Sequence, residues 1–350
     1  MLVPALVLAA SVALCARPLP NPDLTRIKAD LEYLASPAQT GRETATPGAA
    51  RAAAHIAQAM QDAGLSPIKA GGLGGVTPFH QGWDYDGWLA RRHPGRLGRA
   101  LGPRLAAEAS NVVGVIPGRD PALTGEYVFI TAHFDHLGLQ GGELHPGADD
   151  NASGTSGLLE VMRLLRYAQP RRSIAFLAVS GEEEGLLGSA AFLAQPPVPL
   201  KAIVADLNMD MIGRGRPGEL HIMPARRSGY VTTLTRDARQ AAARHGYTLS
   251  DGVEQFWRDS DEYSFLAQGI PSLTFMTGLH PDYHRPSDTP DKIDYRKLGA
   301  TVAIVRDLAL RTADAATGPE ALPESQWSHW TWGPYPDGDA SLDYPLARAN

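Results

Sequence analysis

The sequence has one cysteine, Cys15, among its 350 residues. A single cysteine excludes a disulfide within the chain, and it leaves any metal site to histidine and carboxylate side chains unless Cys15 takes part. The chain also has no excess of basic residues, since its formal net charge is −6. A basic surface is what nucleic-acid binding requires, so no nucleic-acid partner is expected.

Long hydrophobic runs are scarce as well. The apolar run at residues 1–16 is too short to cross a bilayer as a helix, and it ends in small residues. We therefore expect a signal peptide at 1–16, cleaved after Ala13 or Ala16, and a secreted or periplasmic protein, although no lysine or arginine precedes the run. The alternatives are a buried N-terminal helix and a lipid-modified Cys15, and only the latter would anchor the protein to a membrane.

The remaining composition is that of a globular protein, with 43% hydrophobic and 20% charged residues. Runs rich in β-branched and aromatic residues predict buried strands at 111–116, 127–132, 173–179, 202–209 and 272–276. Apolar residues at helical spacing predict helices at 22–34 (capped by Asn21), 46–64, 158–167, 231–245 and 298–310. This alternation predicts an α/β fold, a mostly parallel mixed sheet with helices on both faces.

We expect one folded domain at 17–313. Within it, residues 71–105 are rich in Gly, Arg and Trp and predict an irregular excursion before the sheet begins. The tail at 314–350 is rich in proline and tryptophan, and we expect Trp327, Trp330 and Trp332 to pack back on the domain.

Metal-binding side chains follow one predicted strand after another. They are His133, Asp135, Glu182, Glu183, Glu184, Asp210 and His284, and the pair Asp149 and Asp150 precedes the helix at 158–167. The carboxyl ends of parallel strands meet at one edge of a sheet, where ligands bind. Adjacent carboxylates repel one another, so a nearby cation would stabilise them. Histidine with carboxylate ligands is typical of catalytic zinc.

The charges of these side chains, and the spacing of Asp135 from His133, support a site for two zinc ions. Two Zn²⁺ would be neutralised by Asp149, Glu183 and Asp210 together with a hydroxide, if both histidines are neutral. Asp135 lies two residues after His133, so it can accept the other imidazole N–H and fix the tautomer.

Six segments resemble the motif series of the bacterial secreted di-zinc aminopeptidases, of the leucyl aminopeptidase and aminopeptidase Y type. They are LEYLASPAQTGRETATPG, HFDHLG, PGADDNASG, SGEEEGLLGS, NMDMIGR and HPDYHRPSDTPDKID, and the resemblance covers residues 24–310. Glutamate carboxypeptidase, glutaminyl cyclase and the transferrin receptor are distant relatives. The resemblance implies a zinc-exopeptidase (phosphorylase/hydrolase-like) architecture.

The resemblance also implies roles for individual residues. Two zinc ions would have five protein ligands: Asp149 as the bridge, His133 and Asp210 at one ion, and Glu183 and His284 at the other. Glu182 would be the general base, Glu184 a bystander, and Tyr283 a candidate for steadying the oxyanion. The chain departs from the family at Ser260-Asp261-Glu262, where Ser-Asp-His is frequent, and we expect this change to alter the pocket wall.

The expected function is an aminopeptidase that removes N-terminal residues, preferably apolar ones, from peptides or proteins. Two zinc ions would activate water as a hydroxide, and Glu182 would accept its proton. A carboxypeptidase or dipeptidase on the same scaffold is the main alternative, which the chain length disfavours. A glutaminyl cyclase and a non-catalytic binding domain are further alternatives, and the complete ligand set disfavours both.

Overall fold

The computed structural model describes residues 19–68, 79–93, 108–225 and 232–324. The predicted signal peptide, the three tail tryptophans and most of the predicted excursion lie outside these ranges. Among the described residues, no helix has the length and apolar character needed to cross a membrane.

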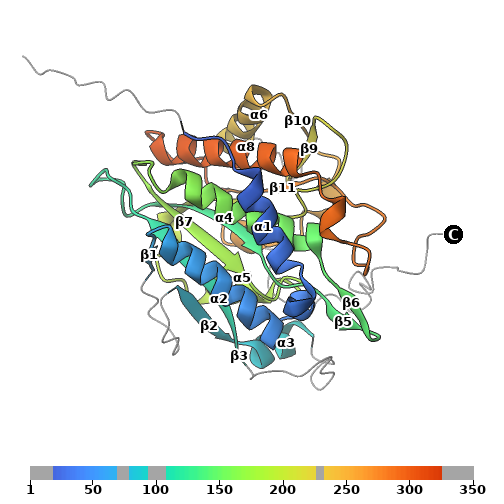
Figure 1. Cartoon of the computed structure of the whole chain (residues 1–350). Coiled ribbons are helices and arrows are strands. Elements are labelled where there is room, and N and C mark those ends of the chain that lie inside the picture. The colour runs from blue at the N-terminus through green and yellow to red at the C-terminus, as the bar shows by residue number, and fades with distance from the viewer. Residues whose placement is uncertain (1–18, 69–78, 94–107, 226–231, 325–350) are drawn as a thin grey trace, which may run out of the picture.

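A mixed sheet runs through the middle of the molecule (Figure 1). Its order is β1 (Ser66–Pro67), β3 (Glu108–Ile116), β7 (Ser173–Val179), β4 (Tyr127–His133), β8 (Ile203–Met209), β11 (Ser272–Met276), β9 (Glu219–Met223) and β10 (Thr248–Ser250), and β2 (His80–Asp84) also pairs with β3. The four central strands β7, β4, β8 and β11 are parallel neighbours, whereas β3 and β9 flank them in antiparallel pairing. A separate hairpin joins β5 (Gly138–Gln140) and β6 (Glu143–His145).

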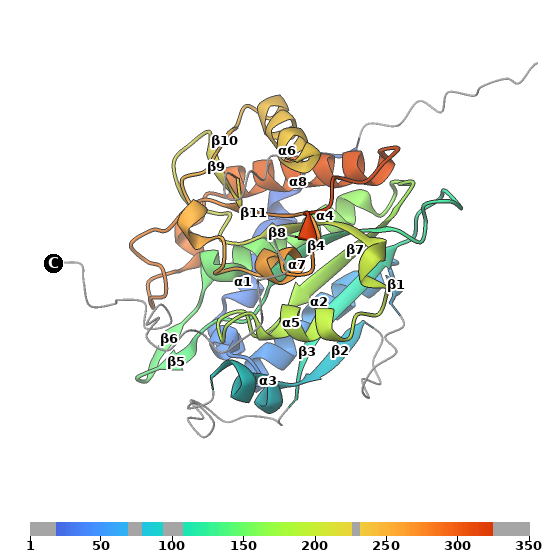
Figure 2. The ribbon, with the colours of Figure 1, turned by 180° about the vertical axis from the view of Figure 1, so that it is seen from behind.

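Helices cover both faces of this sheet. They are α1 (Leu24–Leu34), α2 (Pro47–Asp62), α3 (Tyr85–Arg92), α4 (Gly154–Leu165), α5 (Leu187–Ala194), α6 (Thr233–Arg244), α7 (Glu262–Leu266) and α8 (Tyr295–Asp314). Figure 1 shows α1, α2, α4 and α8 on the near face, and Figure 2 shows α5 and α7 on the opposite one. The predicted α/β architecture is confirmed.

Alternating side chains explain why the central strands are buried on both faces. In β4, Val128 and Ile130 join the core beneath α4 and α8, whereas Phe129 joins the core on the α5 side. The Phe129 ring meets that of Phe192 from α5 edge-on, with 5.5 Å between centroids. Successive side chains of a strand point to opposite faces, so an unbroken apolar run is what such a strand needs.

The helix starts are partly as predicted. Thr46 caps α2, with Pro47 at its first position, as expected. For α1 the cap is Asp23 rather than Asn21: the Asp23 carboxylate accepts hydrogen bonds from Thr25 N and Arg26 N. Asp23 N in turn donates to Glu160 of α4 at 2.8 Å. Asp is a favoured N-cap residue, so the local sequence also allowed this start, and the contact with Glu160 adds a tertiary constraint.

The predicted excursion at 71–105 contains regular structure in the part that is described. His80–Asp84 form β2 and pair with β3, and the Asp84 carboxylate caps α3. The irregular interpretation was therefore wrong for these residues. The β2 sequence HQGWD has no β-branched residue, so its strand conformation depends on pairing with β3 rather than on intrinsic preference.

Arg42 connects the segments that surround the strand ends. Its guanidinium is fully buried and donates to four carbonyl oxygens at 2.6–2.9 Å, those of Leu34, Phe134, Pro146 and Gly147. Burial lowers the pKa of Arg42 to about 10, so it stays charged at neutral pH. One cation thus fixes both loops, 133–138 and 146–151, against the end of α1.

We expect Arg42→Met to lower the free energy of unfolding by about 3 kcal/mol or more, because it leaves several buried carbonyls without a donor at roughly 1–3 kcal/mol each. Arg51→Met is the matched control. Arg51 is exposed and donates to a single carbonyl, that of Ala38, so its loss should cost under about 1 kcal/mol. Denaturant unfolding of both variants measures the difference, and equal small losses would contradict the role given to Arg42.

Candidate active site

The register of the parallel strands brings three functional segments level. His133 at the end of β4 pairs with Val179 at the end of β7, three residues before Glu182. Thr131 pairs with Asn208 of β8, so two residues further on His133 stands beside Asp210. Residues separated by up to 77 positions therefore meet at one edge of the sheet.

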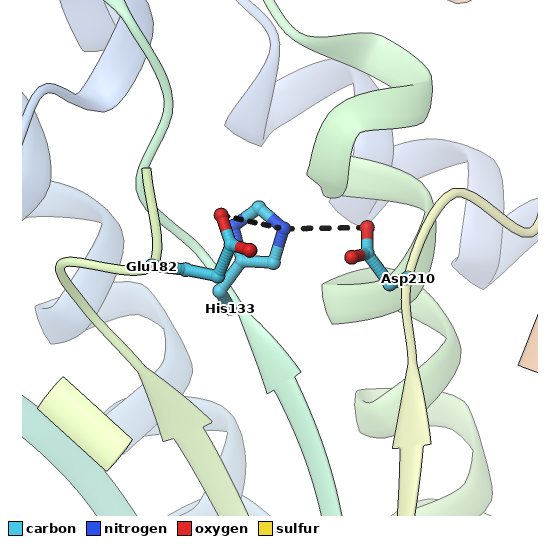
Figure 3. A group of neighbouring side chains, drawn as sticks. All are labelled: His133, Glu182 and Asp210. Atoms are coloured by element: carbon cyan, nitrogen blue, oxygen red, sulfur yellow. Dashed lines mark hydrogen bonds and ion pairs between the residues drawn. The ribbon is translucent and has the colours of Figure 1, made fainter. Parts of the chain in front are cut away.

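The first cluster is centred on His133. Its Nε2 lies 3.3 Å from Asp210 Oδ1, 3.4 Å from Asp150 Oδ1 and 3.9 Å from Glu182 Oε2. Figure 3 shows the imidazole between the Glu182 and Asp210 carboxylates, which come from the ends of different strands. The His133 side chain is buried, and these carboxylates are nearly so.

The second cluster surrounds Glu183. Nε2 of His284 lies 3.0 Å from Asp150 Oδ2 and 3.1 Å from Glu183 Oε2. Nδ1 of His136 lies 2.7 Å from Glu183 Oε1. Asp150 thus faces both clusters, with one carboxylate oxygen toward His133 and the other toward His284.

Asp149, which we expected to bridge the two metals, does not lie between the two clusters. Asp149 Oδ1 accepts a hydrogen bond from Gly213 N at 2.7 Å, and Oδ2 lies 3.2 Å from Nε2 of His280. Asp150 rather than Asp149 thus lies between the two clusters. Residues 148–153 form an irregular turn, and contacts with Gly213 and His280 direct the Asp149 side chain away from both clusters. No periodicity in the sequence could decide between two neighbouring aspartates.

Asp135 contacts His133 differently from what we expected, because the acceptor nearest to His133 Nδ1 is the Asp135 main-chain oxygen, at 3.3 Å. The Oδ1 of Asp135 is 3.7 Å from His133 Nδ1, and it accepts a hydrogen bond from Glu182 N at 3.2 Å. Its Oδ2 accepts from Thr44 Oγ1 at 2.9 Å and from Glu183 N at 3.4 Å. One buried carboxylate therefore contacts His133 and holds the main chain of both glutamates.

Tyr283 stacks on His284, with ring centroids 3.8 Å apart and an interplanar angle of 22°. The stacked pair lies on the loop after β11. His136 is a component of the second cluster that the sequence reasoning missed. The signal was present in the HFDH segment, where a second histidine follows His133 by three residues.

The protonation behaviour of the two adjacent glutamates differs. Burial raises the pKa of Glu182 well above its ordinary value, and Glu183 and Asp210 add to the effect while His133 opposes it. Burial also opposes ionisation of Glu183, but His284 and His136 outweigh it and hold its pKa well below the ordinary value. Glu182 is therefore the better proton acceptor of the two.

The histidines show how much negative charge the site contains. Burial disfavours their charged forms, yet Glu182 and Asp210 raise the pKa of His133 well above the ordinary value. Glu183 and Asp150 likewise raise the pKa of His284 to about 10. Such an excess of buried negative charge needs positive charge to balance it, and metal ions are one source.

Comparison with known proteins decides the family. A profile of peptidase family M28 matches residues 111–309, more than half of the chain. The chain belongs to peptidase family M28.

Individual relatives agree with this family. The chain is 32% identical over 183 residues to aminopeptidase YwaD of Bacillus subtilis, covering 49% of this chain and 38% of that protein. It is 29% identical over 251 residues to a probable leucine aminopeptidase of Arthroderma otae, covering 65% of this chain and 66% of that protein. The match thus spans less than two thirds of either relative.

Solved structures share the fold at low identity. A zinc aminopeptidase from Bacillus subtilis superposes with a TM-score of 0.63 at 19% identity, over 86% of this chain and 97% of that one. A glutaminyl cyclase from Bacteroides thetaiotaomicron superposes with a TM-score of 0.61 at 19% identity, over 84% and 99%. At this identity the likeness shows the fold alone.

A pocket opens beside the clusters of this M28 protein. On the metal-binding side it is lined by Asp150, Glu182 and Asp210. The remaining lining residues are mostly apolar: Met211, Met223, Phe256, Met276 and Leu279, with Asp259 and Tyr283. Glu262, expected to alter the pocket wall, is not among the lining residues, because it is fully buried on α7. Burial raises its pKa well above the ordinary value.

A buried chain of polar groups leads from the sheet to Asp210. Thr131 Oγ1 lies 2.9 Å from Asp206 Oδ1 and 3.0 Å from Asn208 Oδ1. Asn208 Nδ2 donates to Ser260 Oγ at 2.8 Å, and Ser260 Oγ donates to Asp210 Oδ2 at 2.7 Å. All are almost completely buried except Asp210, which is slightly more exposed.

The protonation state of Asp206 decides whether every hydrogen-bond acceptor in this series of side chains has a donor. A hydroxyl carries one hydrogen, so Thr131 can donate to Asp206 or to Asn208 but not to both. A proton on Asp206 would donate to Thr131 and free the hydroxyl hydrogen for Asn208. Burial raises the pKa of Asp206 to about 7, which agrees with the protonated form.

We expect Asp206→Asn to remove a pH dependence of stability. Because the pKa of Asp206 is about 7 in the folded state and about 3.9 in the unfolded chain, the folded state binds the extra proton. Wild-type stability should therefore fall as pH rises from about 4 to about 7, by up to about 4 kcal/mol. An asparagine amide can donate to Thr131 as the protonated acid does. The stability gained from the substitution should thus grow over this range, as measured by denaturant unfolding of chelator-treated protein.

Asp120→Asn is the control of opposite sign, because Arg171 lowers the pKa of half-buried Asp120. This variant should lose stability near neutral pH, and the loss should fade as pH falls. A pH-independent difference between Asp206→Asn and wild type would rule out the protonated Asp206.

Proposed function

We propose that this M28 protein is a zinc-dependent aminopeptidase. One observation carries the proposal: the two oxygens of Asp150 face two different histidines, each with a further carboxylate beside it. This is the arrangement of a carboxylate that bridges two metal ions. The relatives named as aminopeptidases support the same reaction.

The distances in both clusters fit zinc. Two ligands bonded to one tetrahedral zinc at about 2.0–2.1 Å lie roughly 3.3 Å apart. The separations from His133 to Asp210 and Asp150 are 3.3 and 3.4 Å, and those from His284 to Asp150 and Glu183 are 3.0 and 3.1 Å. Glu182 is farther from His133, at 3.9 Å, which leaves it free of the ligand set.

We therefore assign the metal ligands as follows: His133 and Asp210 at one ion, Glu183 and His284 at the other, and Asp150 at both. Asp149 is replaced by Asp150 in this assignment. When bound, the two zinc ions would polarise a peptide carbonyl and lower the pKa of water.

The chain's own residues would carry the proton transfers. Glu182 lines the pocket, and its raised pKa suits a group that accepts a proton and later returns it. It would take a proton from the attacking water and deliver it to the departing amine nitrogen. Asp135 would keep Glu182 and Glu183 in place through their main-chain N–H groups. Tyr283, stacked on His284 at the pocket, is the candidate for steadying the carbonyl oxygen.

The pocket indicates which residue is removed. Three methionines, Phe256 and Leu279 offer an adaptable apolar wall to a side chain. A free N-terminus would place its ammonium among the carboxylates Asp150, Glu182 and Asp210. Export, by contrast, stays a prediction of the sequence, since residues 1–18 lie outside the described part of the structure.

We expect release of single residues from peptides with a free N-terminus, with leucine and methionine cleaved faster than aspartate. A panel of aminoacyl-nitroanilides with and without a chelator measures this. The matched N-acetylated compounds should not be cleaved. Equal cleavage of acetylated and free substrates would favour another exopeptidase, and conversion of N-terminal glutamine to a cyclic product would favour a glutaminyl cyclase.

Three neighbouring variants separate base, ligand and bystander. Glu182→Gln should keep close to two zinc ions per chain while turnover falls by roughly 10²–10⁴, the usual loss for a general base. Glu183→Gln should lose zinc, because it removes a charged ligand. Glu184→Gln should change neither, since Glu184 belongs to neither cluster.

Zinc content by elemental analysis and turnover are measured on all three variants and the wild type. If Glu184→Gln lost turnover but retained its zinc, the roles of base and ligand would have to be reassigned by at least one residue. A wild-type protein without bound zinc, purified without chelator, would refute the proposed function.

A further inference from the structure

His136 has a place in the second cluster that the proposed reaction does not use. Its side chain is fully buried, and its Nδ1 lies 2.7 Å from Glu183 Oε1. Its ring meets that of His284 edge-on, with 5.7 Å between centroids and an interplanar angle of 71°. The open question is whether His136 binds a metal itself or acts on a ligand.

The distances decide between these two roles. Ligands of one tetrahedral zinc lie roughly 3.3 Å apart, whereas a hydrogen bond to a carboxylate measures about 2.7–2.9 Å. The His284 separations of 3.0 and 3.1 Å lie between the two values, and its Nε2 faces two carboxylates at nearly equal distance. The 2.7 Å between His136 Nδ1 and Glu183 Oε1 is a hydrogen-bond distance and is short for two ligands of one tetrahedral zinc, whereas His136 Nδ1 lies 3.8 Å from Asp150 Oδ2.

The surroundings of the ring also fix its tautomer. Nε2 of His136 is buried and has no hydrogen-bond partner among the described residues. A neutral imidazole carries its proton on the nitrogen that has an acceptor, which here is Nδ1 facing Glu183.

The loop that carries Asp150 holds the ring in place. A Cβ added to Gly147 would come within 2.5 Å of His136 Cγ and Cδ2, so the ring lies directly against the main chain there. Gly147 also has a φ of +55°, which favours glycine. The imidazole therefore fills the space between the main chain of the Asp150 loop and Glu183.

We infer that His136 is a positioning residue for Glu183. Its Nδ1–H donates to Glu183 Oε1 and thereby presents Oε2 to the second metal position, beside His284. The inference rests on the proposed two-zinc site and deepens it. It assigns to the second site an outer hydrogen bond of the kind that tunes metal affinity.

Two substitutions of His136 test the donated hydrogen bond. In His136→Asn the amide Nδ2 takes the place of Nδ1 and can still donate to Glu183. In His136→Leu no donor remains. Chelator-stripped protein is given measured amounts of Zn²⁺ against a chromophoric competitor, so that the affinities of the two sites are obtained separately and without any assay of activity.

We expect His136→Leu to weaken the second zinc by about 10–100-fold and to leave the first nearly unchanged. His136→Asn should retain most of the wild-type affinity. Thermal unfolding of the metal-free proteins shows whether each variant folds. Should His136→Leu fail to fold, His136→Gln replaces it, because the glutamine amide reaches the position of Nε2 rather than that of Nδ1.

The other outcomes overturn the inference. Undiminished affinity in His136→Leu would show that the hydrogen bond does not matter. Equal losses in the asparagine and leucine variants would indicate that the imidazole itself is needed, as a metal ligand would be. Both results leave the proposed function standing, whereas a wild-type protein that binds no zinc would remove the proposed function and the inference together.

Discussion

Mutual repulsion between buried carboxylates is the constraint on which this structure depends. Asp135, Asp150, Glu182, Glu183 and Asp210 all lie at one edge of the sheet, buried or nearly so. Ionised carboxylates at such depth are costly unless cations or hydrogen bonds compensate them. This negative charge raises the pKa values of His133 and His284, because it favours their protonated forms. Two divalent metal ions would balance this buried negative charge more completely than two protonated histidines.

The protein holds these charges together by fixing the main chain that carries them. Arg42 donates to carbonyls of both the 133–138 and the 146–151 loops, and Asp135 accepts from the N–H groups of Glu182 and Glu183. The register of β7, β4 and β8 brings the strand ends level. These hydrogen bonds and the strand pairing hold the carboxylates close together, because each carboxylate belongs to a segment that is hydrogen-bonded to a neighbouring one. This rigidity is what a preorganised metal site requires.

Adjacent residues acquire different chemistry because their surroundings differ. Glu183 lies between His284 and His136, whose interactions with it favour its ionised form and hold its pKa low. Glu182 lies one residue earlier but faces the pocket, where burial dominates and raises its pKa. Asp149 and Asp150 also have different contacts: Asp149 contacts Gly213 and His280, whereas Asp150 faces both clusters. In both pairs the amino-acid type is identical, and the neighbouring elements decide the function.

The strands at the centre of the sheet, and the histidine and carboxylate side chains at its edge, could be predicted from the sequence. Apolar runs such as 127–132 and 173–179 predict strands buried on both faces, and the parallel arrangement places His133, Glu182 and Asp210 at one edge. The folded arrangement was needed to show that Asp150 rather than Asp149 faces both histidines and that His136 bonds to Glu183. Periodicity describes regular elements, whereas the direction of a side chain in an irregular turn depends on contacts from residues distant in sequence. The pocket wall could not be predicted from the sequence either, because Met211, Met223 and Met276 are distant in sequence and come together through the pairing of strands.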